Sequence, residues 1–140
     1  MFSTLLFSTM FLCCNEHSTP PKQLNSNTSS EHPSSLREVS VPQLFTLTAQ
    51  SEPIIIDVRT EREFKSGHIP SAQNIPMSEL SDRLNDLEQH KNKDIYLVCA
   101  VGGRSGQAQK YLNPLGFSTI NVMGGTKEWK EKKYPIELPE

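Results

Sequence analysis

The chain has 140 residues, which is the usual length of a single domain. Its 16 acidic and 14 basic residues leave a net charge of −2, which argues against a nucleic-acid-binding protein, since such proteins carry a strongly basic surface. The three cysteines stand at positions 13, 14 and 99, and this spacing excludes a disulfide-rich scaffold, because adjacent cysteines do not readily pair.

The composition changes sharply along the chain. Residues 1–14 carry no charged side chain and are mostly apolar, as in the apolar part of a signal peptide, but they are fewer than the ~18–20 residues that span a membrane. Residues 15–35 are mostly Ser, Asn, Thr and Pro, and we interpret them as a disordered tether, because they have too few apolar side chains to form a core. A folded domain is predicted for residues 36–140.

The N-terminus allows three interpretations. An apolar run that ends in Cys13-Cys14 and precedes a polar tether resembles a bacterial lipoprotein signal, in which a cysteine becomes the lipidated first residue. It departs from that pattern because no Lys or Arg precedes the run and the usual small residues do not precede either cysteine. The alternatives are another cleaved export signal and an unprocessed tail of a cytoplasmic protein. The lipoprotein interpretation predicts an exported, membrane-anchored protein that faces the periplasm or the cell exterior.

The first half of the domain begins with a short edge strand at 38–40 and a helix at 41–50, which has leucines at helical spacing. Residues 53–58 form a continuous apolar, β-branched run. Because this run lacks alternation, both of its faces are predicted to be buried, as in a central strand of a parallel sheet. Another short strand is predicted at 72–75.

The second half continues with a helix at 78–89 and a strand at 94–99 that is apolar on both faces, like the run at 53–58. A helix at 105–115, a strand at 118–122 and a short basic helix at 126–133 follow.

Strands that alternate with helices predict an α/β domain with a mainly parallel central sheet of about five strands, flanked by helices on both faces. In such sheets the binding crevice lies beyond the carboxyl ends of the strands. That rule points to Asp57 and Arg59 after one central strand, and above all to Cys99 after the other. Asp57 and Arg59 are expected to brace the site through polar pairing.

Cys99 ends a predicted buried strand and is followed by a loop and then a helix. A thiol at this junction lies over the N-terminus of the helix, where free N–H groups favour the thiolate, and Arg104 adds a positive charge nearby. Two consecutive glycines, Gly102 and Gly103, let the loop curl so that several N–H groups converge on one point. The sequence therefore predicts a reactive cysteine with a lowered pKa in an anion-binding loop.

The loop Cys-Ala-Val-Gly-Gly-Arg-Ser at 99–105 resembles the active-site loop of the rhodanese family, which commonly reads Cys-x-x-Gly-x-Arg-Ser. Segments at 56–76, 111–117 and 122–135 resemble other signatures of the family, in the right order and spacing, and the match covers about residues 38–137. Ser71 stands where the family more usually has glycine.

The resemblance implies sulfur transfer. The Cys99 thiolate would take a sulfur atom from a donor such as thiosulfate or polysulfide, form a persulfide, and pass the sulfur to a thiol or cyanide acceptor. It also implies that no metal or organic cofactor is needed. The loop residues expected to bind the donor and stabilise the persulfide are Ala100, Val101, Gly102, Gly103, Arg104 and Ser105.

The loop argues against two other functions on this fold and leaves a third open. A phosphatase or arsenate reductase needs a wider loop with five residues between Cys and Arg, whereas four residues separate Cys99 from Arg104 here. Non-catalytic members usually lack the nucleophile, which is present. A carrier that hands persulfide to a partner protein, with little turnover of free thiosulfate, stays open.

Overall fold

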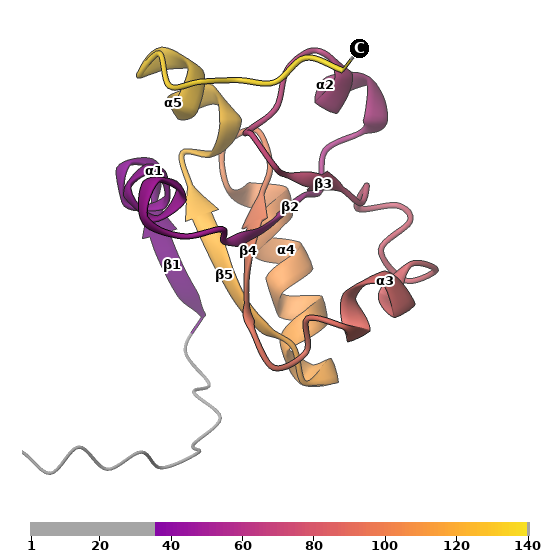
Figure 1. Cartoon of the computed structure of the whole chain (residues 1–140). Helices are drawn as coiled ribbons and strands as arrows, with labels where there is room; N and C mark the ends of the chain where they lie inside the picture. Colours follow the sequence, from indigo (N-terminus) through magenta and orange to yellow (C-terminus); the bar gives the residue numbers. More distant parts are fainter. Residues whose placement is uncertain (1–35, 140) are drawn as a thin grey trace, which may run out of the picture. The chain divides into compact units, whose positions relative to one another are not determined.

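The computed structural model describes residues 36–139. Its centre is a five-stranded sheet with the strand order β1-β5-β4-β2-β3 (Figure 1). All four strand pairs of this sheet are parallel, and the short strands β1 and β3 form its edges. The strands are β1 (Arg37–Ser40), β2 (Ile54–Asp57), β3 (Gln73–Asn74), β4 (Asp94–Val98) and β5 (Ser118–Met123). The predicted α/β class and parallel sheet are confirmed.

Four helices connect these strands: α1 (Val41–Gln50), α2 (Glu61–Lys65), α3 (Leu84–Glu88) and α4 (Gly103–Leu112), the last followed by a 3₁₀ turn (Asn113–Leu115). A fifth helix, α5 (Gly125–Glu131), follows the last strand. Helix α4 lies along β4 and β5 (Figure 1). No helix within residues 36–139 is long and apolar enough to cross a membrane. Residues 1–35, with Cys13 and Cys14 among them, lie outside the described residues.

Both faces of the central strands are buried, as their unbroken apolar runs predict. Successive residues of β2 point to opposite faces: Ile55 packs with α1 and α5, whereas Ile56 packs with α3 and α4. The cluster on the first face consists of Val41, Leu44, Ile55, Ile69, Val98, Val122 and Trp129. The cluster on the other face includes Ile56, Leu80, Leu87, Leu97, Cys99, Ala108 and Leu112.

The predicted helix at 78–89 is wrong over its first half. Helix α3 begins only at Leu84, and turns precede it. The backbone there closes in short turns, such as the bond from the N–H of Asp82 to the carbonyl of Glu79 (3.1 Å), while the Arg83 side chain donates to the carbonyl of Asn74 (3.1 Å). Leu80 and Leu87 are still buried, so the leucine spacing correctly identified core positions and not a continuous helix.

Three other helices also differ from the prediction, and the helix predicted at 126–133 is α5, which ends at Glu131. Helix α4 starts at Gly103, two residues before the predicted start, and its last predicted turn is a 3₁₀ turn. Helix α2 was not predicted at all, although Thr60 and Glu63 carry a capping-box signature. The Thr60 hydroxyl accepts from the N–H of Glu63 (3.3 Å), and the Glu63 carboxylate accepts from the N–H of Thr60 (3.1 Å). This reciprocal cap stabilises a helix of only five residues.

The segment after α2 adopts an unusual turn at Ser71, whose φ is +62°, in the left-handed region where glycine is favoured. The N–H of Ser71 donates to the Glu137 carboxylate (3.2 Å). The C-terminal segment passes beside this region, where Glu137 and His68 form an antiparallel bridge (Figure 1). These contacts hold the turn without the glycine that is usual there.

Candidate active site

Cys99 directly follows β4, which lies in the sheet between β5 and β2. It therefore stands at the carboxyl end of the parallel strands, where the sequence placed the site. Cys99 is 1% exposed and packs within the cluster on the α3–α4 side of the sheet. Val101 and Gly103 of the loop are exposed, so the loop separates the sulfur atom from solvent.

The loop folds back over the Cys99 sulfur. The N–H of Gly102 donates to Sγ (3.1 Å), and the Ser105 hydroxyl lies 3.4 Å from it. Gly102 has a φ of +111°, and a Cβ there would lie 3.3 Å from the Met123 sulfur. Glycine is thus favoured at this position by its backbone conformation, and a Cβ would also require the Met123 side chain to shift slightly.

The pKa of the Cys99 thiol is lowered from its usual value. Burial alone raises this pKa, but hydrogen bonds outweigh burial. The Ser105 hydroxyl contributes most, followed by the backbone N–H groups of Ser105, Gly102 and Val101. These donors favour the thiolate, which is the nucleophilic form of cysteine. The arrangement can therefore generate a sulfur nucleophile without a neighbouring general base.

Asn121 is a residue of this site that the sequence analysis did not identify. It lies on β5, is buried, and accepts a hydrogen bond from the Ser105 hydroxyl at 2.6 Å. A hydroxyl has one proton, so donation to Asn121 and donation to the Cys99 sulfur compete. We expect Ser105 to donate to Asn121 when Cys99 is a thiol and to donate to Sγ once Cys99 is ionised. Only the pairing of β4 with β5 brings Asn121 to the loop.

Replacing Ser105 with alanine is expected to raise the pKa of Cys99. The rate of alkylation by iodoacetamide increases as pH rises through the thiol pKa, so the midpoint of the rate against pH reports this pKa. Loss of the hydroxyl hydrogen bond is expected to move the midpoint upward by about 0.5–1 pH unit. Ser118→Ala is the matched control, because the Ser118 hydroxyl bonds to the exposed Asp94. An unchanged midpoint in Ser105→Ala would show that this hydroxyl does not stabilise the thiolate.

The N-terminal end of α5 holds the loop from the other side. Three backbone bonds run from the N–H groups of Thr126, Lys127 and Gly124 to the carbonyl oxygens of Cys99, Ala100 and Val101, at 2.9, 3.0 and 3.2 Å. In a trans peptide the N–H points opposite to the C=O. The bonded carbonyls therefore turn the next N–H groups, including those of Val101 and Gly102, away from α5 and toward the cysteine sulfur.

Gly125 makes this close contact possible. Its φ is +53°, and a Cβ there would overlap the Cys99 carbonyl oxygen and come within 2.7 Å of the carbonyl carbon of Ala100. Any larger side chain must displace either the loop or α5. Gly125 lies within the segment 122–135 that resembles a family signature, but its contact with the cysteine loop was not predicted from the sequence.

Arg104 lies in the first turn of α4 and pairs with Glu63 of α2. Its two terminal nitrogens donate to the two carboxylate oxygens of Glu63, at 2.8 and 2.7 Å. The Arg104 hydrogen bond lowers the pKa of Glu63 to about 2, although burial opposes the change. The pKa of Arg104 is raised, first by this bond and to a smaller extent by the charge of Cys99. Arg104 thus lies close enough to Cys99 to interact with the charge of the thiolate, but its terminal nitrogens are hydrogen-bonded to the carboxylate of Glu63.

Asp57, the last residue of β2, forms a buried ion pair with Arg59 at 2.7 Å. The Arg59 guanidinium also donates to the carbonyls of Glu63 and Gly67, both at 3.1 Å. The pair therefore ties α2 and the following turn to the end of β2. Its connection to the cysteine loop passes through Glu63 and Arg104, since the Arg59 bonds go to Asp57, Glu63 and Gly67.

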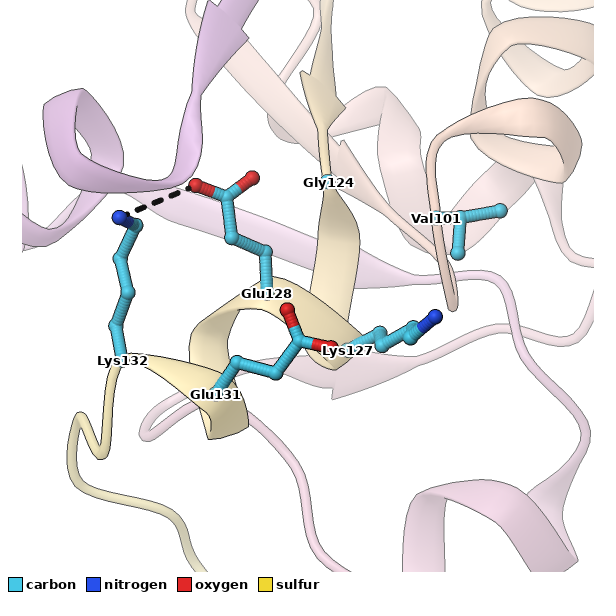
Figure 2. A pocket seen from close by; sticks show the side chains of 6 residues that line it. All are labelled: Val101, Gly124, Lys127, Glu128, Glu131 and Lys132. Carbon is cyan, nitrogen blue, oxygen red and sulfur yellow. Dashed lines mark ion pairs between the residues drawn. The ribbon is translucent and has the colours of Figure 1, made fainter.

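A cavity of about 560 Å³ lies beside the loop. Figure 2 shows Val101 and Gly124 on the loop side of it and the ion pair of Glu128 and Lys132 (3.5 Å) on the other side, where Glu128 belongs to α5 and Lys132 directly follows that helix. The remaining residues that line it are Lys127 and Glu131. Cys99 is not among the lining residues, so this cavity adjoins the outer side of the loop and not the thiol itself. Among residues 36–139, no group of three or more His, Cys, Asp or Glu side chains is arranged to hold a metal ion.

Comparison with known proteins agrees with this geometry. The family model of the rhodanese-like domain matches residues 40–132. A human thiosulfate:glutathione sulfurtransferase is 36% identical, and the match covers 68% of this chain and 94% of that protein. YrkF of Bacillus subtilis, named as a candidate sulfur carrier protein, is also 36% identical over 74% of this chain, but the chain spans only 56% of its length.

The crystal structure of a rhodanese-like domain protein from Staphylococcus aureus has a TM-score of 0.68 and 35% identity to the chain. The structural match covers 75% of the present chain and 100% of the Staphylococcus aureus chain. The region matched by the family model, residues 40–132, contains the whole sheet except the first residues of β1, together with the cysteine loop and α5. The chain therefore belongs to the rhodanese-like domain family.

Proposed function

We propose that the protein is a sulfurtransferase that moves one sulfur atom from a donor to an acceptor through a persulfide on Cys99. The observation that carries this proposal is the cysteine sulfur itself, with a lowered pKa and with the N–H of Gly102 and the hydroxyl of Ser105 directed at it. A thiolate held in this way attacks the outer sulfur of a donor.

With thiosulfate as donor, the Cys99 thiolate attacks the terminal sulfur, the S–S bond of thiosulfate breaks, and sulfite leaves with the bonding electron pair. Cys99 then carries a persulfide anion. In the second step an acceptor attacks the outer sulfur of the persulfide and restores the thiolate; cyanide gives thiocyanate, and a thiol gives a new persulfide. Charge and electrons balance in both steps without an external oxidant or cofactor, and the expected kinetics are ping-pong.

The loop would serve both steps. Its N–H groups from residues 100–105 favour negative charge on the cysteine sulfur and then on the persulfide, because they point to the place where that charge resides. Arg104 would bind the oxygens of an anionic donor, in competition with the Glu63 carboxylate that its terminal nitrogens contact. Asp57 and Arg59 would act at a distance, since they hold the segment that carries Glu63.

A persulfide carrier is the alternative within the same chemistry. A relative at 36% identity is named as a candidate sulfur carrier, whereas another is named a thiosulfate:glutathione sulfurtransferase. The two roles differ in the second step: an enzyme releases sulfur to small acceptors in many turnovers, and a carrier passes it to a protein.

The experiment is intact-mass spectrometry followed by a turnover assay. Incubation with thiosulfate is expected to add the mass of one sulfur, about 32 Da, and subsequent addition of cyanide is expected to remove it and release thiocyanate. Repeated turnover supports the enzyme. A stable persulfide that cyanide and small thiols discharge slowly would favour the carrier. Absence of the added mass with both thiosulfate and polysulfide would reject sulfur transfer through Cys99.

We also propose that the protein is exported and anchored to a membrane by a lipid on Cys13 or Cys14. The apolar run of residues 1–14 is shorter than the ~18–20 residues that span a bilayer, so this run would need an attached lipid to hold the protein at a membrane. The 21 residues 15–35, which their composition predicts to be a tether, would reach roughly 25 Å as a flexible coil and would hold the domain clear of the membrane surface. In fractionated native cells, a membrane-associated pool is expected, and a Cys13→Ala, Cys14→Ala double variant is expected to lose it. Full-length protein that retains Met1 in the soluble cytoplasm would reject both export and anchoring.

A further inference from the structure

Arg104 is the charged side chain of the cysteine loop, and its guanidinium is hydrogen-bonded to the carboxylate of Glu63. Both terminal nitrogens of the guanidinium bond to the two carboxylate oxygens of Glu63. The two side chains are 36% and 38% exposed, so the ion pair lies where the loop meets solvent. A donor that reaches the cysteine loop from solvent therefore meets a neutral pair and not a free cation.

Glu63 is held in position for this contact by residues other than Arg104. Its carboxylate accepts from the N–H and the hydroxyl of Thr60, at 3.1 and 2.8 Å. Its carbonyl accepts from the buried guanidinium of Arg59 (3.1 Å), which is itself paired with Asp57. Because the cap of α2 and the buried ion pair fix its backbone and side chain, Glu63 loses little further freedom when it binds Arg104.

This arrangement has a consequence for the charge of the donor. Thiosulfate carries two negative charges, and it must approach a thiolate that already carries one. A free Arg104 would offset part of that repulsion, but the carboxylate of Glu63 cancels the charge of Arg104 at short range. A donor with the same terminal sulfur and one negative charge fewer suffers less from this cancellation.

We propose that Glu63 is a specificity-determining residue that acts through Arg104: by holding the guanidinium in an ion pair, it disfavours dianionic donors and favours donors that carry less negative charge beside the transferred sulfur, such as a monoanionic thiosulfonate or a persulfide. This inference rests on the proposed sulfur transfer through Cys99. Under this proposal, a residue outside the cysteine loop determines which donor charge the site prefers.

Thiosulfate and methanethiosulfonate form a matched pair of donors for the test. In both, the Cys99 thiolate attacks the terminal sulfur; sulfite leaves from the first and methanesulfinate from the second, each with the bonding electron pair. The measured quantity is the ratio of kcat/KM for thiosulfate to kcat/KM for methanethiosulfonate, with cyanide as acceptor. A change in the amount of folded protein cancels in this ratio.

In Glu63→Gln the ratio is expected to rise about three- to ten-fold, because Arg104 keeps its charge and loses the opposing one. The KM for thiosulfate is also expected to increase more steeply with salt than in the unmodified protein, since screening weakens attraction between free charges. Glutamine still accepts from the N–H of Thr60, so α2 keeps its cap.

Two control variants separate charge at Arg104 from other effects. Glu61→Gln removes a carboxylate from the same helix that pairs with the exposed Lys65, and its ratio is expected to stay within about two-fold of the unmodified protein. Glu63→Asp keeps a negative charge near Arg104 and is expected to keep the ratio close to its original value.

An unchanged ratio in Glu63→Gln would overturn the role of Glu63, and so would an equal rise in Glu61→Gln, which would show only a long-range effect of net charge. Both results leave the proposed function intact as long as either donor puts a persulfide on Cys99. If neither of these donors nor polysulfide does so in the unmodified protein, the proposed function itself fails.

Discussion

Cys99→Ser is expected to abolish sulfur transfer, with a loss of more than about three orders of magnitude in turnover. A serine hydroxyl at this position keeps the size of the side chain and can still accept from the N–H of Gly102, so the fold is expected to survive. It lacks a polarisable sulfur that ionises near neutral pH, and the loop cannot lower the pKa of an alcohol far enough to replace it.

Three measurements check this prediction together. Thiocyanate release reports turnover, intact mass after thiosulfate reports the persulfide, and thermal unfolding reports the fold. Ser118→Ala is a suitable control, because its hydroxyl bonds to Asp94 on the sheet and not to the loop. Normal turnover in a folded Cys99→Ser protein would end the mechanism, and the other cysteines, at 13 and 14, would then have to be tested.

Gly125→Ala is expected to reduce sulfur transfer by about ten- to a hundred-fold, because a displacement near 1 Å is enough to misplace a reacting group. The new Cβ would overlap the carbonyls of Cys99 and Ala100, and the residue would have to keep a φ of +53°. Displaced carbonyls lose their bonds to α5, and the loop N–H groups then no longer converge on the sulfur. The pKa of Cys99 is expected to rise. A lower overall stability, which only reduces the amount of folded protein, would not change this pKa in the molecules that remain folded.

Gly106→Ala is the matched control for this substitution. Gly106 lies within α4, has no positive φ, and a Cβ there would lie 3.4 Å from the Asn121 amide, which is ordinary contact. Alanine also favours the helix. The measurements are kcat/KM with thiosulfate and the pH midpoint of Cys99 alkylation in both variants. If Gly125→Ala keeps the activity and midpoint of Gly106→Ala, the contact between α5 and the loop does not position the catalytic N–H groups.

Much of the fold could be predicted from local patterns. The continuous apolar runs at β2 and β4 predicted strands that are buried on both faces, since a strand exposed on one face would alternate. Helix α1 was predicted with its observed bounds because its leucine spacing agrees with the helical period. Helix α3 shows the limit of such patterns: Leu80 and Leu87 are both buried, but turns are sufficient to bury the first of them.

By itself, the sequence determined the parallel α/β domain, the position of Cys99 at the carboxyl end of a central strand, and a loop whose glycines let N–H groups face the sulfur. These features depend on residues that are neighbours in the chain, so local periodicity and backbone freedom decide them. Tertiary structure alone decided that Glu63 binds Arg104, that Asn121 receives the Ser105 hydroxyl, and that α5 holds the loop carbonyls. The partners of these contacts lie on separate elements, and only the packing of those elements at one end of the sheet brings them within hydrogen-bonding distance.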